Sequence, residues 1–566
     1  DKAKIIGSYR ADDIRLYAQP KGFTVEAILM AVHRLKGKAS GTQERTGAKR
    51  SFAGSSLPSF LSRKRGMFYY RPFPGPITLE SDMKSHSSAP RWAIPFVLLA
   101  LLVLGLLFVP ECDDCYFIFW KFGSWQDLLL TRPNTQDALV VGVPHNGRYL
   151  GNLLGVLQAK LYFTPLFFLR GILLGGSLIA LVLLLARRFR SRAVGRGEAF
   201  LLSAALVVIS SRGLWQQVYS WGAALVNYLL PMLGLLILLG WMEKNPKRPT
   251  SLARTALLAL ACCLFMETVT IYLALAALAV LVWAWFFCRD RLPGALALAL
   301  GSWLGAAIMF LSPGYAQTGS DTRSVGLELA RDNLHRIVTD TFVLPVVATA
   351  LISFLLVWLL RRQGCSWWKL WGGVLLPVHL FCLFFAVGDL FRTESLYSDG
   401  QLILGLLMAA VWLIALLQWR GGAAKIRILL LALSLCVLNG PLLFVSPVGP
   451  RNLFCGYVVL MLVAGELYTC ARTQGLGSLH WLRFPLAGAC VLLVALYACN
   501  FTVYHQRLEY AWEQVEAGAQ SVTLPLVPFN GWVTNEFPGK GDISYLVYRQ
   551  SPWDVSFTFV PRELDG

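Results

Sequence analysis

Two adjacent aspartates, Asp113 and Asp114, are the residues of this chain whose type and setting most suggest chemistry. They lie in the segment Glu111–Tyr116, directly after a long apolar run that ends at Pro110. Adjacent carboxylates beside a membrane can bind a divalent cation such as Mg²⁺ or Mn²⁺ through their oxygens. One of them can instead act as a general base that removes the proton of a hydroxyl group. The alternative without chemistry is that the pair only begins a solvated loop.

The two aspartates cannot share one role, because successive side chains diverge on a helix or a strand. One of them is expected to face a cavity and the other to be structural, as a helix cap. Of the two, we take Asp114 as the candidate base. Cys112 and Cys115 flank the pair and could form a short disulfide outside the reducing cytosol. A thioredoxin-like redox role is not expected, because its usual βαβ setting is missing.

Three arginines outside the basic gaps are candidates for binding a phosphate group. Arg148 lies in the segment His145–Asn152, Arg323 ends a Gly-rich and Ser-rich segment, and Arg451 stands at the mouth of an apolar run. The planar guanidinium fork suits phosphate and carboxylate groups. The alternative role of these arginines is contact with lipid headgroups or pairing with the acidic residues.

Aromatic and polar residues complete the candidate site. The segment Trp215–Trp221 is either an aromatic belt at the membrane interface or a surface that stacks on a sugar ring. Glu267 lies in an apolar stretch, where a carboxylate is by default functional, or else it lies at the outer water interface. The candidate residues for substrate binding are His145, Asn146, Arg148, Tyr149, Trp221, Asn227, Tyr228, Glu267, Arg323 and Arg451.

The composition indicates which class of protein carries these residues. The 566 residues are 56% hydrophobic and 15% charged, whereas a soluble domain has about 25% charged residues. The net charge of +19 could suggest a nucleic-acid partner. However, the basic residues are crowded into the N-terminal tail and into short gaps between apolar runs, which is typical of loops facing anionic lipid. We therefore exclude nucleic-acid binding and expect a lipid bilayer as the partner. Most of the 12 cysteines lie in apolar runs and are interpreted as small buried hydrophobes.

Apolar runs of membrane-spanning length recur along most of the chain, so the predicted fold class is an all-α polytopic membrane protein with about 13 transmembrane helices. The predicted spans are 92–110, 162–186, 198–211, 224–242, 255–268, 270–288, 293–311, 338–360, 371–389, 400–418, 427–445, 453–471 and 484–502.

The charges between the spans predict the orientation. With the N-terminus inside, every basic gap falls on the same side as the basic tail, and the positive-inside rule makes that side cytoplasmic. The outer face then receives a long first loop, 111–161, and the C-terminal segment. The six basic gaps are Arg187–Arg196, Lys244–Arg254, Arg289–Arg291, Arg361–Lys369, Arg420–Arg427 and Arg472–Arg483.

Three domains are expected. Residues 1–91 form a basic tail rich in Ser, Gly and Pro, expected to be disordered. Met67 and Met83 are candidate starts, so this tail could lie outside the native protein. Residues 92–502 form the transmembrane domain. Residues 503–566 form a small outer-face domain of mixed or β structure, with short strands expected at Ser521–Pro525 and Ile543–Tyr548.

The arrangement resembles the GT-C superfamily of membrane glycosyltransferases. Within or near that superfamily, it most resembles an uncharacterised bacterial multi-pass membrane family. The resemblance covers about residues 92–560. It rests on a first span ending in Asp113 and Asp114, a long first outer loop, and short motifs in later outer segments. These motifs are Asn146-Gly147-Arg148-Tyr149, Asn227-Tyr228, Ser312-Pro313-Gly314 and Pro450-Arg451.

The resemblance implies transfer of a sugar from a polyprenyl-phosphate donor to a cell-envelope glycan or lipid acceptor, on the outer face of the bacterial cytoplasmic membrane. It places the catalytic acidic residue at Asp113 or Asp114, with a divalent cation there if one is used. Two other functions stay open: a transporter or flippase of a lipid-linked saccharide, and a non-catalytic envelope scaffold. A transporter is expected to carry charges deep in several spans or inverted repeats with broken helices. In this chain, polar residues gather at one face instead.

Overall fold

Helices make up most of the part of the chain described by the structure, a computed structural model. The described residues belong to one compact unit. They are 92–119, 131–133, 142–144, 146–316, 324–390, 397–529, 531–534 and 556–560.

Eleven of the thirteen predicted spans each coincide with a helix whose bounds lie within six residues of the prediction. The predicted span 338–360 is interrupted at Leu344 and Pro345, and the helix at 484–502 continues to Glu516. Long apolar runs become helices because a buried backbone must satisfy its own hydrogen bonds in lipid. The helices are α4 (Ala93–Leu107), α8 (Phe167–Phe189), α9 (Arg196–Val208), α11 (Gly222–Ala224) continued by η5 (Leu225–Leu229) and α12 (Leu230–Glu243), α13 (Pro249–Cys263), α14 (Glu267–Phe287), α15 (Leu292–Phe310), α17 (Ala330–Val338) continued by η8 (Thr339–Val343), α18 (Val346–Arg362), α19 (Trp368–Leu390), α20 (Asp399–Gln418), α21 (Gly422–Asn439), α22 (Pro450–Thr473) and α23 (Arg483–Glu516).

Shorter elements connect these helices. Each of the three described sheets has two strands. The elements are α5 (Asp113–Phe119), β1 (Thr131–Pro133) paired with β2 (Gly142–Pro144), α7 (Tyr149–Lys160), α10 (Arg212–Leu214), η4 (Trp215–Tyr219), η6 (Arg289–Arg291), α16 (Pro313–Ala316), β3 (Ser324–Val325) paired with β4 (Val445–Ser446), η7 (Leu327–Leu329), η9 (Gly440–Phe444), η10 (His480–Leu482), and β5 (Ser521–Pro525) paired with β6 (Ser556–Val560).

The number of membrane spans depends on how two bent helix pairs are counted. Within the described residues, nine helices are long and apolar enough to cross a membrane, or up to eleven if each of two bent pairs forms one span. The bends are 85° between α9 and α10, and 65° between η8 and α18. Two further apolar helices, α4 and α13, are shorter. These helices confirm a polytopic all-α membrane protein, whereas about 13 spans and the GT-C likeness stay predictions.

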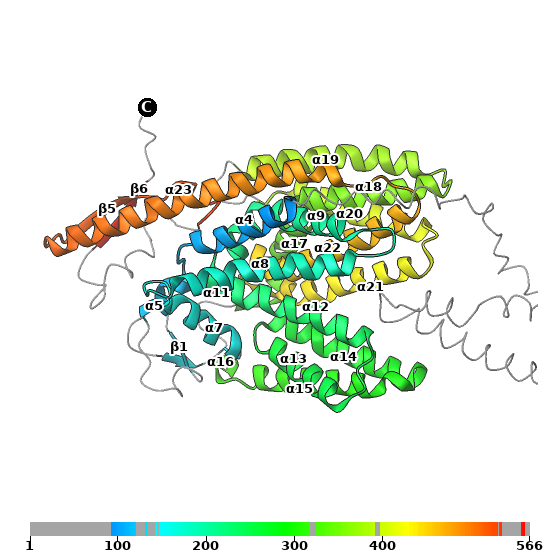
Figure 1. Cartoon of the computed structure of the whole chain (residues 1–566), viewed down its shortest axis with the longest axis horizontal. Helices are drawn as coiled ribbons and strands as arrows, with labels where there is room; N and C mark the ends of the chain where they lie inside the picture. The colour runs from blue at the N-terminus through cyan, green and yellow to red at the C-terminus, as the bar shows by residue number, and fades with distance from the viewer. Residues whose placement is uncertain are drawn as a thin grey trace, which may run out of the picture. The chain divides into compact units, whose positions relative to one another are not determined.

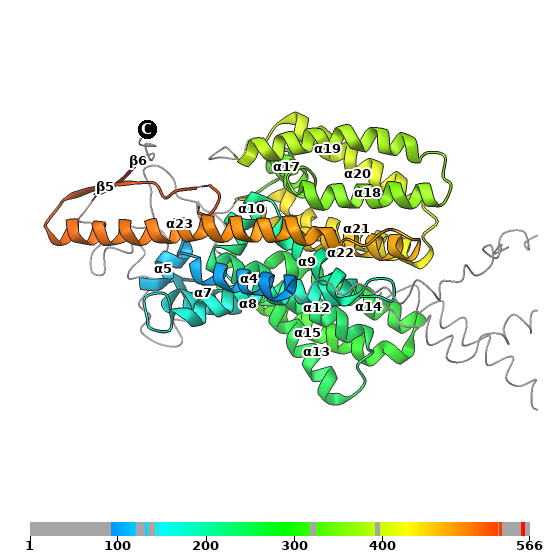
Figure 2. The ribbon, with the colours of Figure 1, turned by 45° about the horizontal axis from the view of Figure 1, so that its top comes forward.

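Helix α22 is the centre of the bundle. Of its apolar stretch 78% is buried, compared with 17% for α19. It packs against α8, α18 and α21. Figures 1 and 2 show α18, α19 and α20 together on one side of it and α13, α14 and α15 together on the other. The outward side chains of α19, such as Leu376 and Phe384, are exposed in the protein, as expected of a surface covered by lipid.

The six basic gaps meet at one end of the bundle, as the charge pattern predicts. Hydrogen bonds and ion pairs at or beside the gaps link them in a chain, and this places their helix ends together. The links are Asn245 to Asp290, Arg188 to Glu243, Arg472 to Glu198, Arg362 to Gln474, and Arg420 to Gln363.

Helix α23 runs through the expected domain boundary at 502/503. It has 34 residues and is therefore about 50 Å long, whereas the hydrocarbon core of a bilayer is about 30 Å thick. Its second half carries Arg507, Glu509, Glu513 and Glu516, so this half extends beyond the membrane. The membrane-spanning part of α23 and the start of the C-terminal segment thus form one continuous helix.

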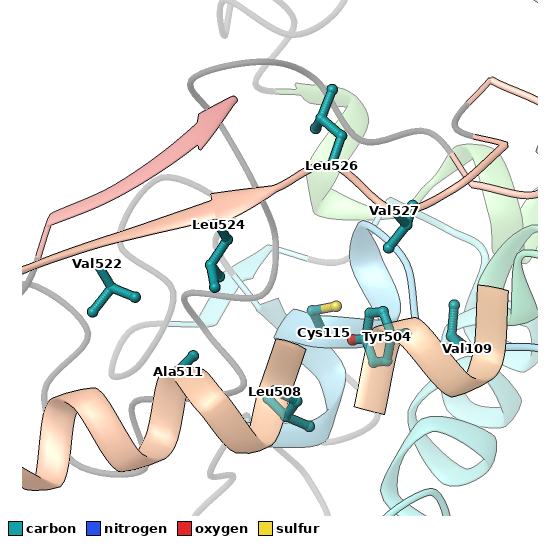
Figure 3. Close-up of a cluster of buried hydrophobic side chains, with 9 residues drawn as sticks. All are labelled: Val109, Cys115, Tyr504, Leu508, Ala511, Val522, Leu524, Leu526 and Val527. Atoms are coloured by element: carbon teal, nitrogen blue, oxygen red, sulfur yellow. The ribbon is translucent and has the colours of Figure 1, made fainter. Parts of the chain in front are cut away.

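The C-terminal strands pack on the extended half of α23 (Figures 1 and 2). In β5, Val522 and Leu524 are buried, and their neighbours in the strand are exposed. The strand predicted at Ser521–Pro525 is present, paired in parallel with β6, and the one predicted at Ile543–Tyr548 lies outside the described residues. Figure 3 shows the resulting apolar cluster, in which Val522 and Leu524 of β5 and Tyr504 and Leu508 of α23 pack together with Cys115 of α5. The tail therefore contacts the helix that carries the acidic pair.

Candidate functional site

The acidic pair begins helix α5, at the end of the bundle opposite to the basic gaps. Cys112 turns the chain with a φ of 44°, and the amide of Asp114 donates to the carbonyl of Glu111 at 2.9 Å. Both aspartates fall in the first turn of α5, where a carboxylate interacts favourably with the helix dipole. Their side chains diverge, and their surroundings differ accordingly.

Asp114 is fully buried, and both of its carboxylate oxygens already accept hydrogen bonds. Its Oδ1 accepts from Gln158 Nε2 at 2.6 Å and from the amide of Ala223 at 2.8 Å. Its Oδ2 accepts from the amide of Gly222 at 3.1 Å and lies 3.6 Å from Arg170 Nη2. Asp114 therefore caps the helix that starts at Gly222, from a distant part of the sequence.

Asp113 is half-buried, and no hydrogen bond or ion pair joins its carboxylate to another described residue. A carboxylate without a donor can accept a proton from a bound hydroxyl group, whereas Asp114 would first have to release its donors. The arrangement favours Asp113 over Asp114 as the base, opposite to our preference from the sequence.

Asp114 is not placed to bind a divalent cation, because its carboxylate faces three N–H donors and an arginine, which repel a cation. A divalent cation at Asp113 stays a prediction. Within the described ranges no group of three or more His, Cys, Asp or Glu side chains gathers in a way that could hold a metal. Cys112 and Cys115 are not joined by a disulfide.

Arg148 and Glu267 form the second part of the site. Gly147 has a φ of 80°, which glycine adopts without strain, and this turn starts α7 at Arg148. Arg148 Nε lies 3.1 and 3.0 Å from the two Glu267 oxygens, and Nη2 lies 2.7 Å from Oε2. Tyr315 OH donates to Glu267 Oε1 at 2.7 Å. Glu267 is the first residue of α14, so this ion pair joins the segment that leads into α7 to the start of α14.

The start of α7 packs closely on η5, the segment that carries Asn227 and Tyr228. A Cβ built on Gly151 would lie 2.0 Å from Asn227 Oδ1, so a larger residue at this position would displace the Asn227 side chain. Asn146 Oδ1 accepts hydrogen bonds from the amide of Arg148 and from Asn152 Nδ2. Tight packing thus brings two motifs together that are about 80 residues apart.

Arg451 and Trp221 also lie next to η5, since α22 packs on this segment. The Arg451 guanidinium carbon is 4.9 Å from the centre of the Trp221 ring. No carboxylate of the described residues pairs with Arg451, which is half-buried at the start of α22. The next residue, Asn452, is 3.4 Å from Tyr228 OH. Arg451 is therefore a half-buried cation held by an aromatic ring, which leaves its hydrogen-bond donors for an anion.

The structure brings most of the predicted residues to one end of the bundle. Tyr149 belongs to this group through Ser312, whose Oγ lies 3.3 Å from its hydroxyl. His145 and Arg323 lie outside the described residues. Gln158, Arg170 and Tyr315 were missed, although Arg170 stands inside the apolar run 162–186, where a charge is itself a signal of function or of buried pairing.

Segments of π-helix mark the same end of the bundle. Among the described residues they are η4, η5 and η8. In most proteins, π-helices contain well under about 1% of the residues, and they often occur at functional sites. Here η5 carries Asn227 and Tyr228, and η4 leads directly to Trp221. The wider turn lets polar side chains leave the regular helix lattice, so these segments support the assignment of the site.

Comparison with protein families, curated proteins and solved structures finds no match to this chain.

The buried Asp114 makes the stability of the fold depend on pH. Burial raises the pKa of its carboxyl group from 3.8 to about 6, against the opposing effect of Arg170. The folded state then binds more protons than the unfolded state between these values, so its stability falls as the pH rises from about 4 to about 6. We expect Asp114→Asn, which does not titrate, to gain up to about 3 kcal/mol relative to the wild type over this interval. Unfolding of both proteins in detergent from about pH 4 to about pH 7 measures the difference; equal pH slopes would refute the assignment.

Proposed function

We propose that this protein is a membrane glycosyltransferase that moves a sugar from a polyprenyl-phosphate carrier to a hydroxyl group of an envelope acceptor. The observation that carries the proposal is that a carboxylate and a guanidinium, neither with an ion-pair partner among the described residues, lie at the same end of a membrane bundle. They are linked through Asp114, which caps the helix that follows Trp221. Asp113 supplies the carboxylate, and Arg451 supplies the guanidinium. A lipid-linked phosphate fits such a site, since its carrier chain stays in the bilayer while its sugar reaches the polar end.

The chemistry is a direct displacement. The oxygen of the acceptor hydroxyl attacks C1 of the sugar, and its proton passes to the carboxylate of Asp113. The bond between C1 and the phosphate oxygen breaks, and the carrier leaves as a polyprenyl phosphate anion. Arg451 stabilises the negative charge that develops on this leaving group. Arg148 offers Nη1 to the same phosphate, because its described contacts with Glu267 use Nε and Nη2.

Loss of Arg451 tests the phosphate site directly. We expect Arg451→Gln to weaken binding of polyprenyl phosphate about tenfold or more, because a charge-assisted hydrogen bond is lost. Arg451→Lys should recover little, since lysine lacks the bidentate fork. The measurement is binding of polyprenyl phosphate to the protein in lipid nanodiscs, with Arg331→Gln, an exposed arginine of α17, as the control. Equal binding by wild type and Arg451→Gln would overturn the phosphate site.

The proposed orientation places this end outside the cytoplasm. It follows from the basic gaps at the opposite end and the positive-inside rule. We expect a phosphatase that works only outside the cytoplasm to be active when fused after Gly566. The same reporter fused after Gln474, in a basic gap, should be inactive. The reverse pattern of activity would show that the acidic pair faces the cytoplasm.

A further inference from the structure

A second group of charged side chains borders the candidate site and takes no part in the proposed reaction. Arg212 of α10 pairs with Asp389 at the end of α19, with Nε to Oδ2 and Nη2 to Oδ1 distances of 3.2 Å each. Asp340 of η8 accepts a hydrogen bond on Oδ2 from Tyr397 OH at 3.3 Å. The guanidinium of Arg336 lies 5.2 Å from the centre of the Tyr397 ring.

Asp340 is the member of this group whose carboxylate has an unsatisfied hydrogen-bond acceptor. Its side chain is only 9% exposed, and its Oδ1 has no hydrogen-bond partner among the described residues. A buried acceptor without a donor is unfavourable for the fold, so such positions are retained where a ligand or water supplies the donor. Two carboxylates, Asp340 and Asp389, stand beside two guanidiniums, Arg212 and Arg336. The charges balance, so the missing partner is a neutral hydrogen-bond donor.

The group lies beside the start of α22, as Arg451 does. Arg336 Nη1 donates to the carbonyl of Val448 at 3.1 Å, three residues before Arg451. Helix α10, which carries Arg212, packs on α22. Asp340 also lies on a π-helical segment, as do Asn227 and Tyr228 of the candidate site. Segments of this rare type thus supply polar residues on both sides of the start of α22.

We infer that Asp340 and Tyr397 form a second subsite that binds a neutral saccharide. A sugar hydroxyl donates to Asp340 Oδ1, and the ring of Tyr397 and the guanidinium of Arg336 lie beside it. A ligand rich in hydroxyl groups provides a neutral hydrogen-bond donor to Asp340 and leaves the charge balance of the group unchanged. The inference rests on the proposed function in one respect: the bound saccharide is taken to be the acceptor, held next to the phosphate at Arg451.

The test uses the full chain in lipid nanodiscs, so that no sugar detergent competes. The probes are methyl glycosides of glucose, galactose, mannose and N-acetylglucosamine, with glycerol at equal concentration as the osmolyte control. We expect at least one glycoside to raise the unfolding temperature of the wild type in a saturable way. Asp340→Asn should weaken its apparent affinity about tenfold or more, because the hydrogen-bond acceptor loses its negative charge and one of its two oxygens is replaced by an NH₂ donor.

Two further variants keep the test decisive. Tyr397→Phe removes one hydroxyl group and should weaken glycoside affinity severalfold, which covers the case in which Asp340→Asn does not fold. Asp332→Asn, an exposed aspartate on α17, should respond as the wild type does. A glycoside response that is equal in wild type and in the folded subsite variants would overturn the inference, as would no response beyond that of glycerol. Polyprenyl phosphate binding is measured separately, so loss of that binding alone would reject the proposed function and leave the saccharide subsite standing.

Discussion

The Asp113→Asn protein is expected to insert and fold as the wild type does and to lose carrier-linked sugar turnover by about 10²–10⁴-fold. Asparagine keeps the size of the side chain and removes the base. The carboxylate of Asp113 has no described partner, so the substitution breaks no contact that holds the fold. Turnover of a radiolabelled polyprenyl-phosphate sugar by purified protein measures the loss, and Asp332→Asn is the matched control.

The comparison with Asp114→Asn separates the two carboxylates. Asparagine at position 114 offers an NH₂ group where the amides of Gly222 and Ala223 and the side chain of Gln158 now donate. We therefore expect a change in stability with pH, and a loss of turnover that follows the fraction of folded protein. Full turnover in both aspartate variants would refute the hypothesis that either aspartate is the catalytic base. It would favour a transporter or a non-catalytic scaffold instead.

Removing Glu267 alone is expected to be the most destabilising single change at the site. The Arg148 and Glu267 side chains are 16% and 19% exposed, and Glu267 also accepts the hydroxyl of Tyr315. Breaking a largely buried ion pair from one side leaves an uncompensated charge, so Glu267→Leu should lose about 3 kcal/mol of unfolding free energy. Replacing both partners by leucine should restore much of this loss, because no charge stays behind.

A matched ion pair at the other end of the bundle serves as a control, because breaking it should lower stability without affecting phosphate binding. Arg427 and Glu466 are each 16% exposed and 3.1 Å apart. Glu466→Leu should cost a similar amount of unfolding free energy and leave polyprenyl phosphate binding unchanged. The Arg148→Leu, Glu267→Leu double variant should recover stability but bind polyprenyl phosphate more weakly than the wild type. Additive stability losses in the double variant would show that the two residues do not act as a pair. Unfolding in detergent and phosphate binding in nanodiscs provide the two measurements.

The membrane helices could be predicted from the sequence because the bilayer imposes a local requirement. A run of about 20 apolar residues that must satisfy its own hydrogen bonds has few alternatives to a helix. The same locality explains why most predicted spans coincide with one helix, and why the six basic gaps meet at one end. It fails for α23, because a helix can continue into water once its span is complete, and for the span predicted at 338–360, which bends by 65° where Leu344 and Pro345 interrupt it.

The composition of the site could also be predicted in part. Asn146, Arg148, Tyr149, Asn227, Tyr228, Glu267 and Arg451 were all selected from the sequence as polar or aromatic residues at one face, and the structure places them at one end of the bundle. Such residues are costly in an apolar chain, so their positions alone carry information.

What the tertiary structure alone decided is which of these groups are free. Asp113 and Asp114 are neighbours of the same type, and their local sequence does not distinguish them. The amides of Gly222 and Ala223 reach Asp114 because α11 begins beside α5 in space. Likewise, Arg148 forms an ion pair with Glu267, whereas Arg451 lies over the ring of Trp221, which does not neutralise its charge. A sequence shows which charges a chain carries, but their availability depends on partners that are brought close only when distant segments pack together.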